Sequence, residues 1–145
     1  MIKPQDLLAL ADRLAASPAE PEGRAAVGRA YYGAFHRAVI LIEEGCGVVL
    51  PRDRDVHGKL RFCLEESKND ELIKIASKLD TLRAERNRAD YNLADARFAR
   101  PVNVQAQLIL AKAIVSEIDA AAAKFGEFKP AIRKYASEVL KLGVR

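Results

Sequence analysis

Tryptophan is absent from this sequence, and cysteine and histidine occur only twice each. Cys46, Cys63, His36 and His57 lack the spacing of metal ligands, so we expect no dedicated metal site and no cofactor. Because the start of the chain does not resemble a signal peptide, both cysteines are expected to be free thiols in the cytoplasm. The sequence therefore favours a cytoplasmic protein without a bound metal.

Long hydrophobic runs are missing as well. The apolar run AVILI at 38–42 is far shorter than the roughly 20 residues that cross a bilayer. The start, MIKPQDLLAL, contains an acid and lacks a long apolar stretch and a cleavage site, so no signal peptide is expected. Glycine-rich phosphate loops, nucleophile elbows and metalloprotease motifs are absent too. The sequence predicts a soluble protein with no membrane partner.

The residues that are abundant favour helices. Half of the 145 residues are hydrophobic, only 6% are aromatic, and Ala, Leu, Glu, Arg and Lys are frequent. This length predicts a single domain over residues 1–145 with a core of useful size. The net charge of +4 and the pI near 9.2 are compatible with a polyanion partner but do not require one.

Hydrophobic residues recur at helical spacing in six segments, at about 4–16, 22–44, 55–66, 69–90, 104–124 and 131–142. Ser17 and Glu20 resemble a capping box before the second segment, and Asp55 and Asn69 are candidate caps of the third and fourth. Residues 91–103 are expected to form a loop that Pro101 closes. We therefore predict an all-α, up-and-down bundle of four to five main helices with its core at about 5–125, followed by a C-terminal amphipathic helix.

The second predicted helix carries polar residues on an otherwise apolar surface. Its broad core face comprises Tyr31, Ala34, Phe35, Ala38, Leu41 and Ile42. Arg29, Tyr32 and His36 lie opposite, with Arg29 and His36 seven residues apart and nearly eclipsed. Gly33 is predicted to leave room between them for something to approach. Tyr31 and Tyr32 are most simply explained as a core aromatic and a rim aromatic.

Arg86 continues a hydrophobic stripe of the fourth predicted helix, formed by Leu72, Ile75, Leu79 and Leu82. One interpretation is structural: the stem packs while the guanidinium reaches water or pairs with Asp90, four residues on. The other is functional, because a guanidinium stays charged at any working pH and its forked donors match a phosphate. The periodicity alone favours neither interpretation.

The two histidines also have structural explanations. His36 by itself is more often a partly buried histidine bonded to a neighbour than a catalyst. His57 lies just after a loop and beside a candidate cap, which favours local structure near a helix start.

Three segments resemble the signature segments of bacterial and archaeal HEPN-domain proteins (higher eukaryote and prokaryote nucleotide-binding). They are GRAYYGAFHRAV at 28–39, HGKL at 57–60 and LRAERNRADYN at 82–92, and with the helix order the resemblance covers about residues 5–125. It implies an up-and-down helical bundle that forms a homodimer. Many members are toxins that cut RNA without a metal and are encoded beside a small nucleotidyltransferase that acts as their antitoxin.

The family's active motif is an Arg followed, after four to six residues, by a His, and two copies meet across the dimer cleft. Arg86 matches the motif arginine, whereas Tyr91 stands at a matching histidine position. A tyrosine, with an ordinary pKa near 10, is a poor base at neutral pH but can donate a proton. In family toxins the antitoxin can nucleotidylate a tyrosine two positions beyond the histidine, where this chain has Leu93.

The resemblance leads to the hypothesis of a HEPN toxin-like, metal-independent endoribonuclease of a toxin–antitoxin or defence system, acting on RNA as a homodimer. Arg86 is the candidate for phosphate, with Tyr91 and His36 assisting in catalysis. Four more residues are candidates for binding or support: Arg29, Tyr32, Asn87 and Asp90.

Two alternatives from other functional classes remain open. The first is a non-catalytic HEPN module that binds a nucleotide or a partner nucleotidyltransferase, which the missing motif histidine favours. The second is a helical oligomerisation unit in which Arg29 and its neighbours form interface ion pairs.

Overall fold

The computed structural model describes residues 1–145 and is an all-α helical bundle, as predicted. Its main helices are α1 (Pro4–Ala15), α2 (Glu20–Ile40), α3 (Val56–Glu65), α4 (Asp70–Tyr91), α5 (Pro101–Ala122) and α6 (Lys129–Glu138). A π-helical turn at Leu41–Gly45 follows α2, and 3-10 turns at Ala96–Ala99 and Phe125–Glu127 flank α5. The only β pairing is an isolated antiparallel bridge between Val48 and Val144.

The chain forms two compact units, each built from two segments. The first comprises Met1–His36 and Lys78–Val115, and the second comprises Arg37–Ser77 and Ser116–Arg145. Each of α2, α4 and α5 contributes residues to both units.

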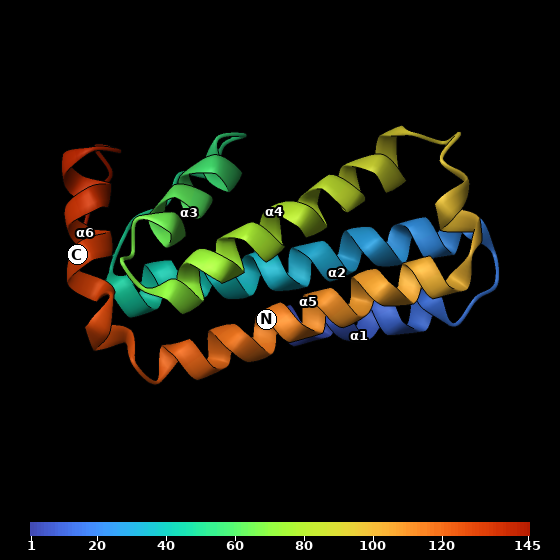
Figure 1. The fold of residues 1–145 in the computed structure, drawn as a ribbon, viewed down its shortest axis with the longest axis horizontal. Helices are drawn as coiled ribbons and strands as arrows, with labels where there is room; N and C mark the ends of the chain where they lie inside the picture. The colour runs from blue at the N-terminus through green and yellow to red at the C-terminus, as the bar shows by residue number, and fades with distance from the viewer. The chain divides into compact units, whose positions relative to one another are not determined.

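In the first unit, α1 and the adjoining parts of α2, α4 and α5 run in alternating directions (Figure 1). Every third or fourth side chain of these helices is apolar and buried, which is the pattern of an amphipathic helix on a shared core. Fully buried members include Val27, Tyr31, Ala34, Leu82, Leu108, Ala111 and Ile114. This core holds the α2 and α4 segments that carry the candidate site residues.

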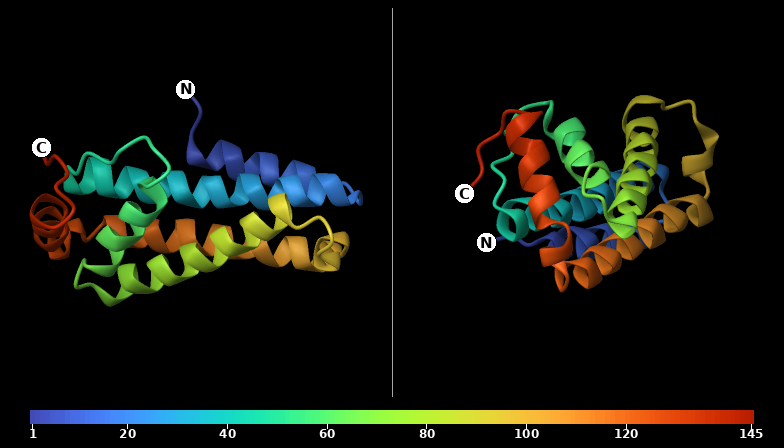
Figure 2. Two further views of the ribbon diagram at one scale, coloured as in Figure 1. Left: turned by 90° about the horizontal axis from the view of Figure 1, so that it is seen from above. Right: turned by 60° about the vertical axis from the view of Figure 1, so that its left-hand side comes forward.

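In the second unit, α6 packs against α3 (Figure 2). The end of the chain returns to the loop after α2, where the Val49 amide donates to the Gly143 carbonyl at 2.8 Å and the Arg145 amide donates to the Gly47 carbonyl at 2.7 Å. Gly47 has a φ of +71°, which an L side chain rarely adopts. Cys46 and Cys63 are buried here as free thiols.

The predicted core faces are confirmed, and several helix ends differ from the prediction. The stripe Leu72, Ile75, Leu79, Leu82 is buried, as are all the residues assigned to the core face of the second predicted helix, of which Leu41 and Ile42 lie in the π-helical turn. Ser17 makes a turn instead of the expected capping box, because its Oγ accepts from the Ala19 amide at 3.2 Å, and α2 begins at Glu20 rather than at 22. The fifth helix begins at Pro101 rather than at 104, which suits a proline in a first turn.

Two predicted caps have different outcomes. The Asn69 Oδ1 accepts from the Leu72 amide at 3.0 Å, as a capping side chain does. Asp55 occupies the cap position of α3 but its side chain makes no capping bond. Instead, the carboxylate of Asp53 accepts from the Asp55 amide at 2.9 Å.

None of the helices combines the length and the apolar character that crossing a membrane demands.

Candidate functional site

Arg86 lies on the α4 face that turns toward α2. Its side chain retains 18% of its exposure, so the guanidinium is mostly covered rather than extended into solvent. The Tyr32 ring of α2 provides part of the cover, with its centroid 5.2 Å from the Arg86 Cζ. The helical stripe that ends at Arg86 thus aims the cation along the buried side of α4.

Neighbours on α4 hold the Arg86 guanidinium. Its Nη1 donates a 2.9 Å hydrogen bond to Oδ1 of Asn87. Its Nε lies 2.9 Å from Oδ2 of Asp90, close enough for an ion pair, but the angle is too poor for a hydrogen bond, so the Nε–H has no acceptor. A guanidinium has five N–H groups; on Arg86 the bond to Asn87 uses one of them, and the buried Nε–H makes no hydrogen bond.

Tyr32 brings a second cation to the site. The Arg29 Cζ lies 5.4 Å from the centroid of the Tyr32 ring, which Arg86 also approaches. Attraction between a guanidinium and the ring quadrupole partly offsets the repulsion between the two like charges. Asp90 supplies one negative charge against these two positive ones, so the group keeps a net positive charge that suits an anion.

Tyr91, the last residue of α4, extends the site to the end of this helix. Its ring centroid lies 5.9 Å from the Arg86 Cζ, and 77% of the residue is exposed. The phenol is therefore accessible to a ligand bound at Arg86. We call Arg29, Tyr32, Arg86, Asn87, Asp90 and Tyr91 the arginine–tyrosine cluster.

His36 lies one helical turn beyond Tyr32 and is exposed. Its ring centroid is 6.2 Å from that of Tyr32 and 5.1 Å from that of Phe35. The structure thus connects His36 to the arginine–tyrosine cluster through the Tyr32 ring. All seven candidate residues lie in the first unit, and the structure brings them to one region. His57, by contrast, lies at the second position of α3, in the second unit, as expected of a residue near a helix start.

The prediction for Gly33 is wrong. A Cβ at this position would lie 2.8 Å from Leu8 Cδ2 and 3.2 Å from the Pro4 carbonyl oxygen. The space beside Gly33 is therefore filled by α1, and it is not an approach to the polar side of α2. Gly28 lies beside the Asp90 carboxylate, and an added Cβ there would make only an ordinary contact of 3.9 Å with Asp90 Oδ1.

Tyr31 is buried beside Tyr32, with ring centroids 5.2 Å apart. Burial raises the pKa of Tyr31 well above its usual value, against the opposing influence of Arg83 and Arg86. Its hydroxyl therefore stays protonated across the physiological range. The expected division into a core aromatic, Tyr31, and a half-exposed rim aromatic, Tyr32, is confirmed.

A buried arginine, Arg24, was not among the residues predicted from the sequence. It is 8% exposed, and its five N–H groups are engaged by Glu20 Oε1 and by four backbone carbonyl oxygens at 2.9–3.2 Å. Those carbonyls belong to Ala89, Asn92, Leu93 and Asp95, at and beyond the C-terminal end of α4. The positive charge faces the negative end of the helix dipole, so Arg24 acts as a cap supplied by another helix.

The sequence contained the signal for Arg24. It lies three residues before Val27 and seven before Tyr31, on the buried stripe of α2, just as Arg86 continues the stripe of α4. An arginine that continues a buried apolar stripe is therefore visible in the sequence at both positions, Arg24 and Arg86.

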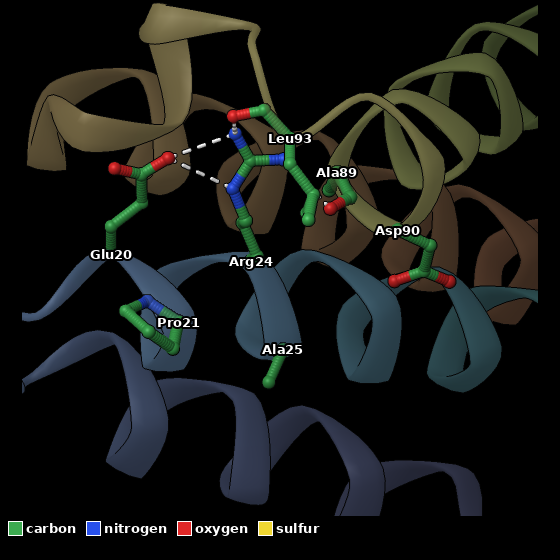
Figure 3. Close-up of a pocket in the computed structure, with 7 residues that line it drawn as sticks. All are labelled: Glu20, Pro21, Arg24, Ala25, Ala89, Asp90 and Leu93. Atoms are coloured by element: carbon green, nitrogen blue, oxygen red, sulfur yellow. Dashed lines mark hydrogen bonds and ion pairs between the residues drawn. The ribbon is translucent and has the colours of Figure 1, made fainter.

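A pocket of about 450 Å³ lies beside Arg24 (Figure 3). It is lined by residues from the start of α2 and from the end of α4 and the residues after it: Glu20, Pro21, Arg24, Ala25, Ala89, Asp90 and Leu93. Asp90 belongs both to this pocket and to the arginine–tyrosine cluster, so the two sites adjoin.

No group of three or more His, Cys, Asp or Glu side chains is placed to hold a metal ion. Comparison with protein-family models, with curated proteins and with solved structures gave no match.

Proposed function

We propose that this protein is a HEPN toxin-like, metal-independent endoribonuclease that binds the RNA backbone at the arginine–tyrosine cluster. The observation that carries the proposal is the Arg86 guanidinium, which is largely covered, is held in place by Asn87 and Asp90, and has a buried Nε–H that makes no hydrogen bond. A preorganised donor of this kind binds a phosphodiester with little further loss of side-chain entropy.

The aromatic residues support RNA as the polyanion. Single-stranded RNA is bound by cations along its backbone and by aromatic rings on which bases stack. Tyr91 is accessible for stacking, and the guanidinium groups of Arg29 and Arg86 both approach the Tyr32 ring. A cluster of two arginines and two tyrosines matches both requirements.

The proposed reaction is an attack by the ribose 2′-hydroxyl on the adjacent phosphorus. The O2′–P bond forms and the P–O5′ bond breaks, leaving a 2′,3′-cyclic phosphate and a 5′-hydroxyl. His36 takes the proton of the 2′-hydroxyl, Tyr91 donates a proton to the leaving 5′-oxygen, and Arg86 stabilises the negative charge on the pentavalent phosphorus. The resemblance to HEPN proteins adds a homodimer, in which two copies of Arg86 share a cleft, and a cognate nucleotidyltransferase antitoxin.

The test is cleavage of transfer and messenger RNA by the purified protein in the presence of a chelator. We expect cyclic-phosphate products from the wild type and a loss of roughly 10²- to 10³-fold in rate for Arg86→Ala, the usual effect of removing a donor that stabilises transition-state charge. Arg88→Ala is the matched control, because Arg88 lies on the same helix, is half-exposed and pairs with Glu85. Equal inertness of the wild type and Arg86→Ala would refute the nuclease.

A non-catalytic module that binds a nucleotide or a partner nucleotidyltransferase is the second candidate. It is favoured by Tyr91, which stands where the HEPN motif has its histidine. Calorimetric titration with ATP distinguishes the two, since a binding module saturates with nucleotide but produces no RNA fragments.

A further inference from the structure

The pocket beside Arg24 offers a ligand only hydrogen-bond acceptors among its polar side chains. The three that line it are Glu20, Arg24 and Asp90. Every N–H of Arg24 donates to an acceptor within the chain, so its guanidinium lines the pocket but has no N–H left for a ligand. Glu20 and Asp90 remain, and an ionised carboxylate accepts but cannot donate. The pocket therefore disfavours a phosphate and suits a group with N–H donors.

The rest of the lining is apolar. Pro21 and Ala25 of α2 and Ala89 and Leu93 at the other side present aliphatic surface, and Leu93 is 76% exposed. A volume of about 450 Å³ falls in the range of small-ligand sites. Aliphatic walls with a few acceptors suit a flat ring that has donors on one edge.

The two carboxylates have different neighbours. Asp90 Oδ2 faces the Arg86 guanidinium, which places this carboxylate beside the proposed phosphate position. Glu20 holds Arg24 through Oε1, at 2.9 Å from Nε and 2.8 Å from Nη2, while its Oε2 makes no hydrogen bond within the chain. Asp90, which contacts Arg86, lines the same pocket as Glu20, so a nucleotide with its phosphate at Arg86 can extend its base into this pocket.

We infer that this pocket binds a nucleobase of the RNA, and that it selects guanine. The inference rests on the proposed binding of RNA at Arg86. Guanine places two adjacent donors, N1–H and the 2-amino group, on its Watson–Crick edge, and Oε2 of Glu20, the oxygen that Arg24 does not use, has two lone pairs that can accept from both. Adenine and cytosine place a ring nitrogen acceptor beside their amino group, and uracil places a carbonyl on each side of N3–H, so a carboxylate repels part of each edge.

The experiment measures the binding of short single-stranded RNAs by fluorescence anisotropy with the full-length chain. Each RNA is a 2′-O-methylated uridine heptamer, which cannot be cleaved, with guanosine, inosine or adenosine at its centre. Two variants change the pocket in different ways. Glu20→Gln keeps an oxygen for Arg24 but replaces the second acceptor with a donor, and Ala25→Leu fills the space from an exposed helical position.

Two further variants are controls outside the pocket lining. Glu71→Gln makes the same chemical change as Glu20→Gln at another exposed glutamate in the first turn of a long helix, here α4. Ala106→Leu enlarges one exposed alanine of α5. They match the change in charge and the change in size of the two pocket variants.

We expect the wild type to bind the guanosine RNA roughly tenfold more tightly than the adenosine RNA, with inosine between them because it lacks the 2-amino group. Glu20→Gln and Ala25→Leu should each abolish the preference, whereas both controls should keep it. Equal binding of all three RNAs by the wild type, or a guanine preference that survives both pocket variants, overturns the inference while leaving RNA binding intact.

Two other results are also decisive. If spermidine binds and Ala25→Leu prevents it while no base preference exists, the pocket holds an amine and the inference is wrong. If the wild type binds none of the RNAs, the proposed function fails together with the inference.

Discussion

Replacing Arg24 with Ala should destabilise the fold far more than removing an exposed charge does. The substitution removes a cation that is 8% exposed and leaves four backbone carbonyls of α4 and the following turn without their donors. A buried polar group that loses its partner costs about 1–3 kcal/mol, and removing one side of a buried charged pair costs about 3–5 kcal/mol. Several of these carbonyls are only partly buried and can bind water once Arg24 is removed, so their separate costs do not add in full. We therefore expect the free energy of unfolding to fall by about 3–5 kcal/mol in total.

The free energy of unfolding, measured by urea titration with circular dichroism, tests this value. For a chain of this size, about 3–5 kcal/mol corresponds to a fall in Tm of roughly 6–20 °C. Arg24→Lys should be intermediate, because an ammonium keeps the charge but has three donors in place of five. Arg88→Ala, which removes a half-exposed arginine of α4, should change stability by less than about 1 kcal/mol. If Arg24→Ala lies within about 1 kcal/mol of the wild type, the capping role assigned to Arg24 is refuted.

Three further predictions concern other parts of the chain. Gly33→Val should lower the free energy of unfolding by about 1–3 kcal/mol, because the new side chain meets Leu8 and the Pro4 carbonyl. In a double-mutant cycle, Leu8→Ala should recover part of this loss. Additive costs of the two substitutions would contradict the clash. Side-chain hydrogen bonds from Arg97 lower the pKa of Asp95 from 3.8 to about 2. The ionised Asp95 carboxylate therefore stabilises the folded chain, and this contribution is complete above about pH 4 and is lost as the pH falls through about 2. NMR titration of the Asp95 carboxyl should show this midpoint, and Arg97→Ala should raise it only part of the way to 3.8, because the backbone N–H of residue 97 still donates to the carboxylate; an unchanged midpoint would exclude the Arg97 side chain as the cause. Burial raises the pKa of Cys46 to about 11 and that of Cys63 to about 12, so both thiols should resist alkylation at pH 8 until the chain unfolds, and rapid labelling of native protein would contradict their burial.

The sequence predicted the helices well where hydrophobic periodicity was long and regular. The segment predicted at 69–90 is α4 at Asp70–Tyr91, since its apolar stripe and the Asn69 cap are local signals. The segment predicted to continue to 142 ends at Glu138, because the last residues pair with the loop after α2. Pairing between residues about a hundred positions apart leaves no local pattern to detect.

The candidate site shows the same distinction. Arg86 could be predicted as a site residue because it continues the apolar stripe of α4, and Tyr32 because it lies opposite the core face of α2. The structure places the two side chains against each other. The pocket could not be predicted, because it exists only where the start of α2 meets the end of α4 and the residues after it. Gly33 was misjudged for a similar reason: a helical wheel shows which side a residue faces but not which helix will cover it.

Phosphate binding by the guanidinium of Arg86 is the central property proposed for this protein. Its direct test is the dissociation constant of a 2′-O-methylated single-stranded RNA, measured at several salt concentrations for the wild type, Arg86→Ala and Arg88→Ala. We predict that Arg86→Ala weakens binding roughly tenfold or more and lowers the salt slope by about one ion, while Arg88→Ala stays within about twofold of the wild type. Equal affinities and equal slopes for Arg86→Ala and the wild type would contradict the account.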